Sequence, residues 1–104
     1  MAKISACVIS FNEEKKIEDC LKSLDGIVDE IIIVDSNSTD STVEVAKRYT
    51  DKIIFQDFLG FIEQKSFAMQ HAKHDWILSL DCDERLSPEL RDAIIKLKDN
   101  IDDV

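Results

Sequence analysis

WILSLDCDER, residues 76–85, is the stretch around which the rest of the chain is organised. It begins with an apolar run of the length of a buried strand and ends in three carboxylates, Asp81, Asp83 and Glu84. Because consecutive side chains of an extended strand point to opposite sides, we expect Asp81 and Asp83 to face the same way and Cys82 to face the other. Two converging carboxylates would suit Mg²⁺ or Mn²⁺, which binds one or two such groups together with phosphate oxygens and water. Aspartate is frequent in this chain, so the position of the triplet, after an apolar strand and before a helix start, is what supports the prediction.

The length and composition predict a single domain over residues 1–104. Of the 104 residues 44% are hydrophobic, and only two are Gly and one is Pro, so the chain can build one ordered core. The 22 acidic and 13 basic residues give a formal charge of −9, which would repel nucleic acid and anionic lipid. We therefore expect no nucleic-acid partner, and a polyanionic ligand such as a nucleotide diphosphate would need a metal ion to offset the repulsion.

The cysteines and the apolar runs bear on the cellular compartment. Cys7, Cys20 and Cys82 are odd in number and lack paired spacing, which argues against a disulfide framework and against a zinc site. No apolar run approaches the roughly 18 residues that span a bilayer, and the first one is too short for a signal peptide. These features predict a soluble, cytoplasmic chain.

Strand and helix patterns alternate along the sequence. Strands are expected at residues 4–10, 30–35 and 52–56 and in the run that begins at Trp76. Helices are expected from residue 17, at residues 41–49 and 61–71, and from residue 88. The alternation predicts an α/β fold, a three-layer sandwich with a mainly parallel sheet, in which ligands bind at the carboxyl ends of the strands.

The expected helices carry apolar stripes and start signals. The stripes of the first, third and fourth helices are Ile17, Cys20, Leu21 and Leu24; Phe61, Phe67, Ala68 and Ala72; and Leu90, Ala93, Ile94 and Leu97. The sequence from Ser41 to Glu44 has the form of a capping box. Ser87 followed by Pro88 predicts an N-cap and a first helical residue.

Polar residues cluster at three strand ends. The clusters are Ser10, Asn12 and Glu14; Asp35, Ser36 and Asn37; and Asp81, Asp83 and Glu84. Carboxyl ends of parallel strands lie along one edge of a sheet, so the three clusters could share one crevice. Any one of these residues is equally compatible with an ordinary solvated loop.

The same residues carry a resemblance to a known family. The stretches at residues 4–14, 31–40 and 76–90, in this order, resemble the amino-terminal half of family 2 glycosyltransferases, which have the GT-A fold. The chain is most similar to the bacterial lipopolysaccharide-core glucosyltransferase type, in which a similar Asp-x-Asp-Glu-Arg-Leu-Ser-Pro-Glu-Leu run occurs. The fold that the resemblance implies is the Rossmann-like, nucleotide-binding half of a GT-A enzyme.

The resemblance also implies roles for particular residues. The nucleotide-sugar-binding set would be Ser10, Asn12, Glu14, Asp35, Lys65 and Asp81. Within it, the loop at residues 10–14 and Asp35 would border the base and ribose, and Lys65 would lie near the base or the diphosphate. Asp81 and Asp83 would form the Asp-x-Asp motif that holds Mg²⁺ or Mn²⁺, with Asp83 as the more direct ligand.

The reaction that the resemblance implies is metal-dependent transfer of a sugar from a nucleotide-sugar, in particular a UDP-sugar, to a glycan or lipid-linked saccharide, with inversion. Family members are longer, so we expect this chain to be the amino-terminal part of such an enzyme, with the catalytic general base beyond Val104 and no catalytic residue within these 104 residues. The complete enzyme would work in the cytoplasm at the inner face of the membrane, as in lipopolysaccharide biosynthesis.

Two other functions stay open at this stage. An aspartate with Mg²⁺ also occurs in phosphoryl-transfer domains, although the partnering Lys and Thr or Ser cannot be traced here. Alternatively, the chain is a non-catalytic α/β domain that forms a homo-oligomer through an exposed sheet edge.

Overall fold

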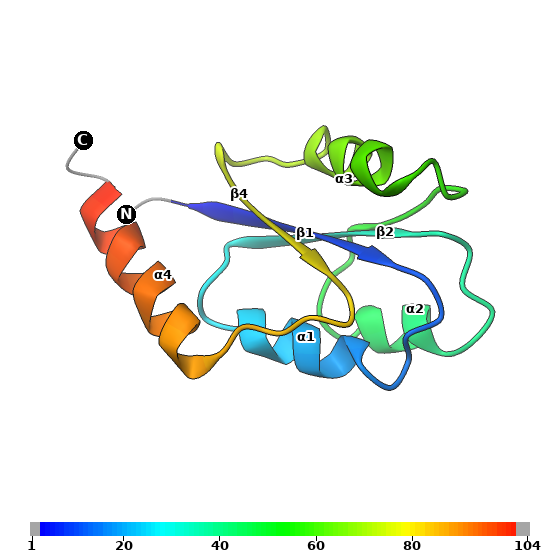
Figure 1. Ribbon diagram of the computed structural model, residues 1–104, viewed down its shortest axis with the longest axis horizontal. Helices are drawn as coiled ribbons and strands as arrows, with labels where there is room; N and C mark the ends of the chain where they lie inside the picture. Colours follow the sequence, from blue (N-terminus) through cyan, green and yellow to red (C-terminus); the bar gives the residue numbers. More distant parts are fainter. Residues whose placement is uncertain (1–2, 102–104) are drawn as a thin grey trace.

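The computed structural model describes residues 3–101 as one alternating α/β chain (Figure 1). The predicted alternation of strand and helix is confirmed. In chain order, the elements are β1 (Ile4–Ser10), α1 (Ile17–Leu24), β2 (Glu30–Asp35), α2 (Thr42–Ala46), β3 (Ile53–Phe55), α3 (Phe61–Met69), β4 (Trp76–Asp81) and α4 (Pro88–Ile101). Among these residues, no helix has the length and apolar character needed to cross a membrane.

The strands form one parallel sheet in the order β3-β2-β1-β4. The chain builds outward from β1 through β2 to β3 and then returns to the other side of β1 with β4, so the strand order reverses next to β1. The register pairs Ser10 with Asp35 and Ile9 with Asp81. The ends of β1, β2 and β4 therefore meet at the topological switch point, where ligands bind in open α/β sheets.

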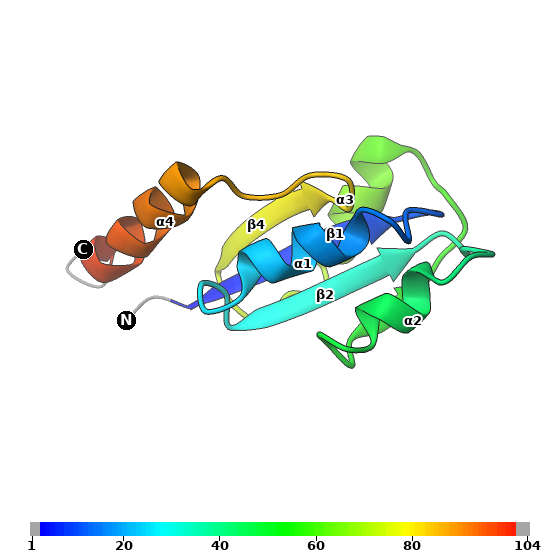
Figure 2. The same cartoon turned by 90° about the horizontal axis from the view of Figure 1, so that it is seen from below.

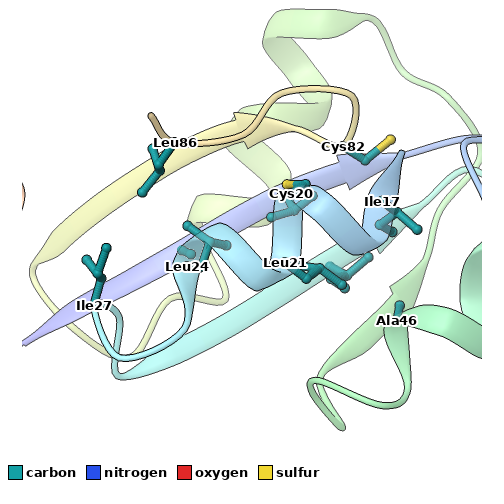
Figure 3. Close-up of a cluster of buried hydrophobic side chains, with 11 residues drawn as sticks. Ile17, Cys20, Leu21, Leu24, Ile27, Ala46, Cys82 and Leu86 are labelled. Atoms are coloured by element: carbon teal, nitrogen blue, oxygen red, sulfur yellow. The ribbon is translucent and has the colours of Figure 1, made fainter. Parts of the chain in front are cut away.

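Helices cover both faces of this sheet, which gives the predicted three layers. Helices α1 and α2 lie on one face and α3 on the other (Figures 1 and 2). The larger core lies under α1 and α2 (Figure 3) and consists of Ala6, Val8, Ile17, Cys20, Leu21, Leu24, Ile27, Ile33, Ala46, Cys82 and Leu86. The smaller core, on the α3 side, consists of Cys7, Ile32, Val34 and Ala68. Strand β1 is buried at every residue, in agreement with a sequence of apolar residues and two small serines.

Two of the predicted helix features are confirmed. All four residues of the α1 stripe are fully buried. At the start of α4, the Ser87 hydroxyl accepts a hydrogen bond from the Leu90 backbone N–H at 3.1 Å, and Pro88 is the first helical residue. The serine satisfies a donor that has no partner inside the helix, which is why this pair of residues starts α4.

The prediction for α2 was partly wrong. The helix starts after Ser41 but ends at Ala46, and no side-chain cap comes from Ser41. Asp40 supplies it instead, because its carboxylate accepts a hydrogen bond from the Thr42 backbone N–H at 2.9 Å. The backbone N–H of Ser41 is bonded to the Glu14 carboxylate, so the local geometry is set by a neighbouring loop that a capping-box pattern does not include.

The predicted apolar faces of α3 and α4 were also partly wrong. On α3, Ala68 is buried, but Phe61 at the first position is 67% exposed. On α4, Ile94 packs against the larger core, whereas Leu90 and Leu97 are 46% and 58% exposed. The reason is the position of α4, which lies at one end of the molecule beside β4 rather than across a sheet face (Figure 2). Strand β4 lies at one edge of the sheet. Such an edge can pair with another strand, and self-association through it stays a prediction.

A buried lysine fastens α4 to the rest of the fold. The ammonium of Lys98, 8% exposed, donates hydrogen bonds to the Ile27 carbonyl at 2.8 Å and to the Asp29 carboxylate at 3.1 Å. The same carboxylate oxygen of Asp29 accepts from the Ile4 backbone N–H at 2.8 Å. The Ile4 hydrogen bond, followed by Lys98, lowers the pKa of Asp29 below its ordinary value of 3.8.

The lowered pKa of Asp29 predicts that the protein loses part of its stability in acid. A carboxyl with a lowered pKa stabilises the folded state above its ordinary pKa, and this contribution disappears as the pH falls through the lowered value. We expect the free energy of unfolding of Asp29→Asn to fall less steeply than that of the wild type between about pH 5 and pH 2, measured by urea titration. Asp51→Asn, at an exposed carboxylate, is the control and should follow the wild type. Parallel curves for wild type and Asp29→Asn would contradict the prediction.

Candidate functional site

A buried carboxylate organises the ends of β1 and β2. Asp35 is fully buried, and its carboxylate accepts hydrogen bonds from the Ser10 hydroxyl at 2.7 Å and from the Ser38 backbone N–H and hydroxyl at 2.7 and 2.6 Å. Both predicted residues, Ser10 and Asp35, therefore lie at the switch point and contact each other. Asp35 fixes the backbone of the loop after β2 in addition to any role in binding a ligand.

The other two predicted residues of the first loop contact the second loop. Asn12 has a positive φ of 48°, and its side-chain oxygen accepts a hydrogen bond from the Thr39 backbone N–H at 2.8 Å. The Glu14 carboxylate accepts one from the Ser41 backbone N–H at 3.1 Å. Asn12 and Glu14 thus join the two loops above the sheet edge, and their assignment to nucleotide binding stays a prediction.

The Asp-x-Asp stretch turns where the sequence predicted an extended chain. Strand β4 ends at Asp81, and Cys82 and Asp83 are the central residues of a turn that the Glu84 backbone N–H closes on the Asp81 carbonyl at 2.9 Å. The Glu84 carboxylate in turn accepts from the Asp81 backbone N–H at 2.9 Å. The alternation argument for Asp81 and Asp83 was therefore wrong, because it requires a strand that continues through Cys82.

The turn nevertheless brings both aspartates to one cavity of about 180 Å³. The cavity collects residues from all three strand ends and from α3. Its lining consists of Ile9, Ser10, Phe11, Glu13, Ser36, Phe58, Phe61, Gln64, Asp81, Cys82 and Asp83. Of the predicted site residues, Ser10, Asp81 and Asp83 line this cavity, whereas Asn12, Glu14, Asp35 and Lys65 lie outside its lining.

Sequence reasoning missed three lining residues, Phe58, Phe61 and Gln64. Phe58 and Phe61 stack edge to face, with ring centroids 5.1 Å apart. Gln64 follows Phe61 by three positions and precedes Ala68 by four, so it is a polar residue on the predicted apolar stripe of α3. That break in the stripe was the signal that could have identified it.

A larger cavity, of about 460 Å³, lies at the opposite edge of the sheet, where the strands begin. Its buried acid, Glu30, already binds the Ser5 hydroxyl at 2.7 Å, the Lys73 backbone N–H at 2.8 Å and the Lys52 ammonium. Since these bonds satisfy the carboxylate and ligands of open α/β sheets bind at the carboxyl ends of strands, we assign the functional site to the smaller cavity.

The carboxylates at this smaller cavity fit a divalent cation. One oxygen of Asp81, Oδ1, is buried and has no hydrogen-bond donor within the described residues, while Asp83 is exposed. The charged neighbour of that oxygen is the Lys65 ammonium, at 3.7 Å. Residues 3–101 contain no group of three His, Cys, Asp or Glu side chains arranged to hold a metal. Two carboxylates completed by phosphate oxygens and water are, however, the usual donor set for Mg²⁺.

The cysteine between the two aspartates does not add a ligand at neutral pH. Cys82 is buried in the larger core, and burial raises the pKa of its thiol to about 11. Burial, followed by the neighbouring Cys82 and acidic groups, raises the pKa of Cys20 to about 12. Both side chains are therefore neutral thiols that pack in the core.

A parallel α/β sheet with a cavity at its switch point is the architecture of nucleotide-binding α/β domains. The chain belongs to Glycosyl transferase family 2, whose sequence profile matches residues 5–104. The predicted family and fold class are thus confirmed, and the family assignment supports glycosyl transfer over phosphoryl transfer.

Several relatives of the chain are bacterial proteins named as glycosyltransferases. An uncharacterized glycosyltransferase of Rickettsia felis is 49% identical over 94 residues, which cover 90% of this chain and 33% of the relative. The lipopolysaccharide core biosynthesis glycosyltransferase LpsC of Rhizobium meliloti is 35% identical over 99 residues, 90% of this chain and 36% of the relative. The chain thus spans about a third of the length of these relatives.

Solved structures agree with this assignment. The crystal structure of S. aureus TarS 1–349 superposes with a TM-score of 0.76 at 25% identity, covering 97% of this chain and 32% of that one. Glucosyl-3-phosphoglycerate synthase from Mycobacterium tuberculosis, in complex with Mn²⁺ and UDP-glucose, superposes with a TM-score of 0.66 at 29% identity, covering 79% of this chain and 33% of that one.

Proposed function

We propose that this chain is the donor-binding region of a metal-dependent glycosyltransferase, which transfers a sugar from a UDP-sugar, with inversion, to a glycan or lipid-linked saccharide. The observation that carries the proposal is the cavity at the switch point, where Asp81, Asp83 and Ser10 meet beside Lys65. Support for the donor comes from the mycobacterial synthase, whose structure contains Mn²⁺ and UDP-glucose. Support for a lipopolysaccharide acceptor comes from the name of LpsC.

Charge explains how the site would take the dianionic diphosphate of a UDP-sugar. The chain has a net charge of −9, and Lys65 supplies a single positive charge at the cavity, paired with Asp81. Asp81 and Asp83 would hold Mg²⁺ or Mn²⁺, which when bound neutralises charge on the diphosphate. Lys65 would then be free to pair with a phosphate oxygen, because the cation would replace it as the partner of Asp81.

The residues at the ends of β1 and β2 would bind the nucleoside. Ser10 and Asp35 are held together by their 2.7 Å hydrogen bond at the end of β1 and β2, and Phe11 lines the cavity next to Ser10. We assign this group to the base and ribose and the group at the end of β4 to the diphosphate and sugar. The described residues in this assignment bind and orient the donor, and none of them is assigned to remove a proton from the acceptor.

Calorimetric titration of UDP and of UDP-glucose into the chain tests the proposal. In MnCl₂ we expect saturable binding with a Kd between about 1 µM and 1 mM, the usual range for enzyme substrates, and loss of binding when a chelator is added. ADP, titrated in the same buffer, is the matched control for the base and should bind more weakly. A chain that is folded by circular dichroism and binds neither ligand in MnCl₂ would contradict the proposal.

A further inference from the structure

The proposed site contains a buried amide to which no role has been assigned. Gln64 on α3 is fully buried. Its side-chain oxygen accepts a hydrogen bond from the Leu59 backbone N–H at 3.2 Å, and its side-chain nitrogen donates to the Ser36 hydroxyl at 3.1 Å and to the Gln56 carbonyl at 3.3 Å. Burying an amide costs free energy unless its polar atoms are hydrogen-bonded. Both the oxygen and the nitrogen of the Gln64 side chain have such partners.

These partners belong to the segments that line the cavity. Ser36 follows β2, and Gln56 and Leu59 lie in the segment at residues 56–60 that joins β3 to α3 and carries Phe58. That segment has no regular secondary structure, and the side chains of Phe58 and Leu59 are half exposed. The segment is held by the Gln56 N–H, which donates to the Asp35 carbonyl at 2.9 Å, by the Asn37 side chain, which donates to Asp57, and by the stacking of Phe58 on Phe61. The side chain of Gln64 adds two hydrogen bonds that join the segment to α3.

The segment at residues 56–60 ends at a glycine whose backbone conformation other residues rarely adopt. Gly60, directly before α3, has a φ of 120°, which side-chain-bearing residues rarely adopt. Its carbonyl accepts a hydrogen bond from the Gln64 backbone N–H at 2.8 Å. Gln64 thus contacts the segment through both its backbone and its side chain, and it directly precedes Lys65, whose ammonium lies 3.7 Å from Asp81.

We propose that Gln64 is a positioning residue for the donor: it holds the segment at residues 56–60, and with it Phe58, as a preformed wall of the cavity that Asp81 and Asp83 line. The inference rests on the proposed function, because it takes UDP as the ligand of this cavity. Holding the wall in place before binding avoids the entropy cost of ordering it when the ligand arrives. Gln64 itself lines the cavity, but the role proposed for it is to hold this wall, and it is not assigned a catalytic role.

The test compares Gln64→Met, which keeps the length of the side chain and removes its hydrogen bonds, with Gln70→Met, at an exposed glutamine directly after the last residue of α3. We expect Gln64→Met to speed hydrogen exchange of the Leu59 amide at least about tenfold without ligand, and to raise the Kd of UDP in MnCl₂ about tenfold. In a Phe58→Ala background, Gln64→Met should raise the Kd less than about twofold further, because both changes remove the same wall. Gln70→Met should change neither quantity.

Each remaining outcome overturns the inference and identifies what failed. Faster Leu59 exchange with an unchanged Kd would show that Gln64 serves the fold alone. Unchanged Leu59 exchange would show that the segment is held by other contacts. If the wild type itself does not bind UDP in MnCl₂, the proposed function fails and the inference falls with it. Should Gln64→Met not fold, Ser36→Ala, which removes one acceptor of the Gln64 amide, replaces it with the same expected directions.

Discussion

Replacing Asp81 with asparagine is expected to weaken manganese-dependent binding of UDP by about 100-fold, because groups that merely orient metal ligands already contribute about 10–100-fold to metal affinity. Asparagine has the size of aspartate and removes only the charge and one acceptor. The affected oxygen is buried and has no hydrogen-bond donor within the described residues, so no protein contact compensates for the change. Calorimetry of UDP in MnCl₂ against the Asp81→Asn variant gives the ratio directly.

The same substitution should leave the fold almost unchanged. The Asp81 contact with Lys65, at 3.7 Å, joins side chains that are 37% and 40% exposed, and such pairs contribute about 0–1 kcal/mol to stability. Asp75→Asn is the matched control, since Asp75 is exposed and directly precedes the same strand at its other end. We expect it to bind UDP like the wild type. An Asp81→Asn variant that is folded and binds UDP with wild-type affinity would exclude Asp81 as a metal ligand.

The sequence was sufficient for the layers of this fold because its apolar runs have distinct lengths and spacings. The β-branched run of β2, which does not alternate, is typical of a strand buried on both faces of a parallel sheet, and both β1 and β2 are buried almost throughout. The two runs that end in Asp35 and Asp81 also placed these carboxylates at one edge of the sheet. In a parallel sheet all strands end at the same edge, so the common location of the two carboxylates followed from the parallel arrangement.

The sequence was not sufficient where one pattern of residue types fits two local geometries, or where contacts distant in the chain decide the geometry. The turn at Cys82 depends on a hydrogen bond from the Glu84 N–H to the Asp81 carbonyl, and a pattern of polar residues is the same whether the strand continues or turns. The stripe of α4 shows which of its sides is apolar but not whether another element covers it. Gln64 shows the same limit, because its partners are Ser36, Gln56 and Leu59, up to 28 positions away.

Replacing Asp35 with alanine is expected to lower the free energy of unfolding by about 3 kcal/mol, since hydrogen bonds to a charged group are worth about 1.5–3 kcal/mol each and the loss of several is partly offset by water. The carboxylate is fully buried, and its removal leaves the Ser10 hydroxyl and the Ser38 hydroxyl and N–H without their acceptor. For a domain of this size the melting temperature should fall by roughly 10–25 °C. Urea titration and thermal melting, both followed by circular dichroism, measure the two quantities.

Two further variants separate the loss of the hydrogen bonds from other effects. Asp35→Asn keeps the shape and one oxygen acceptor, so it should cost less than Asp35→Ala. Asp51→Ala makes the same change at an exposed position before β3 and should stay within about 0.5 kcal/mol of the wild type. If Asp35→Ala is as stable as Asp51→Ala, the bonds to Ser10 and Ser38 do not hold the two strand ends together. A loss of UDP affinity in that stable variant would then mean that Asp35 acts on the ligand directly.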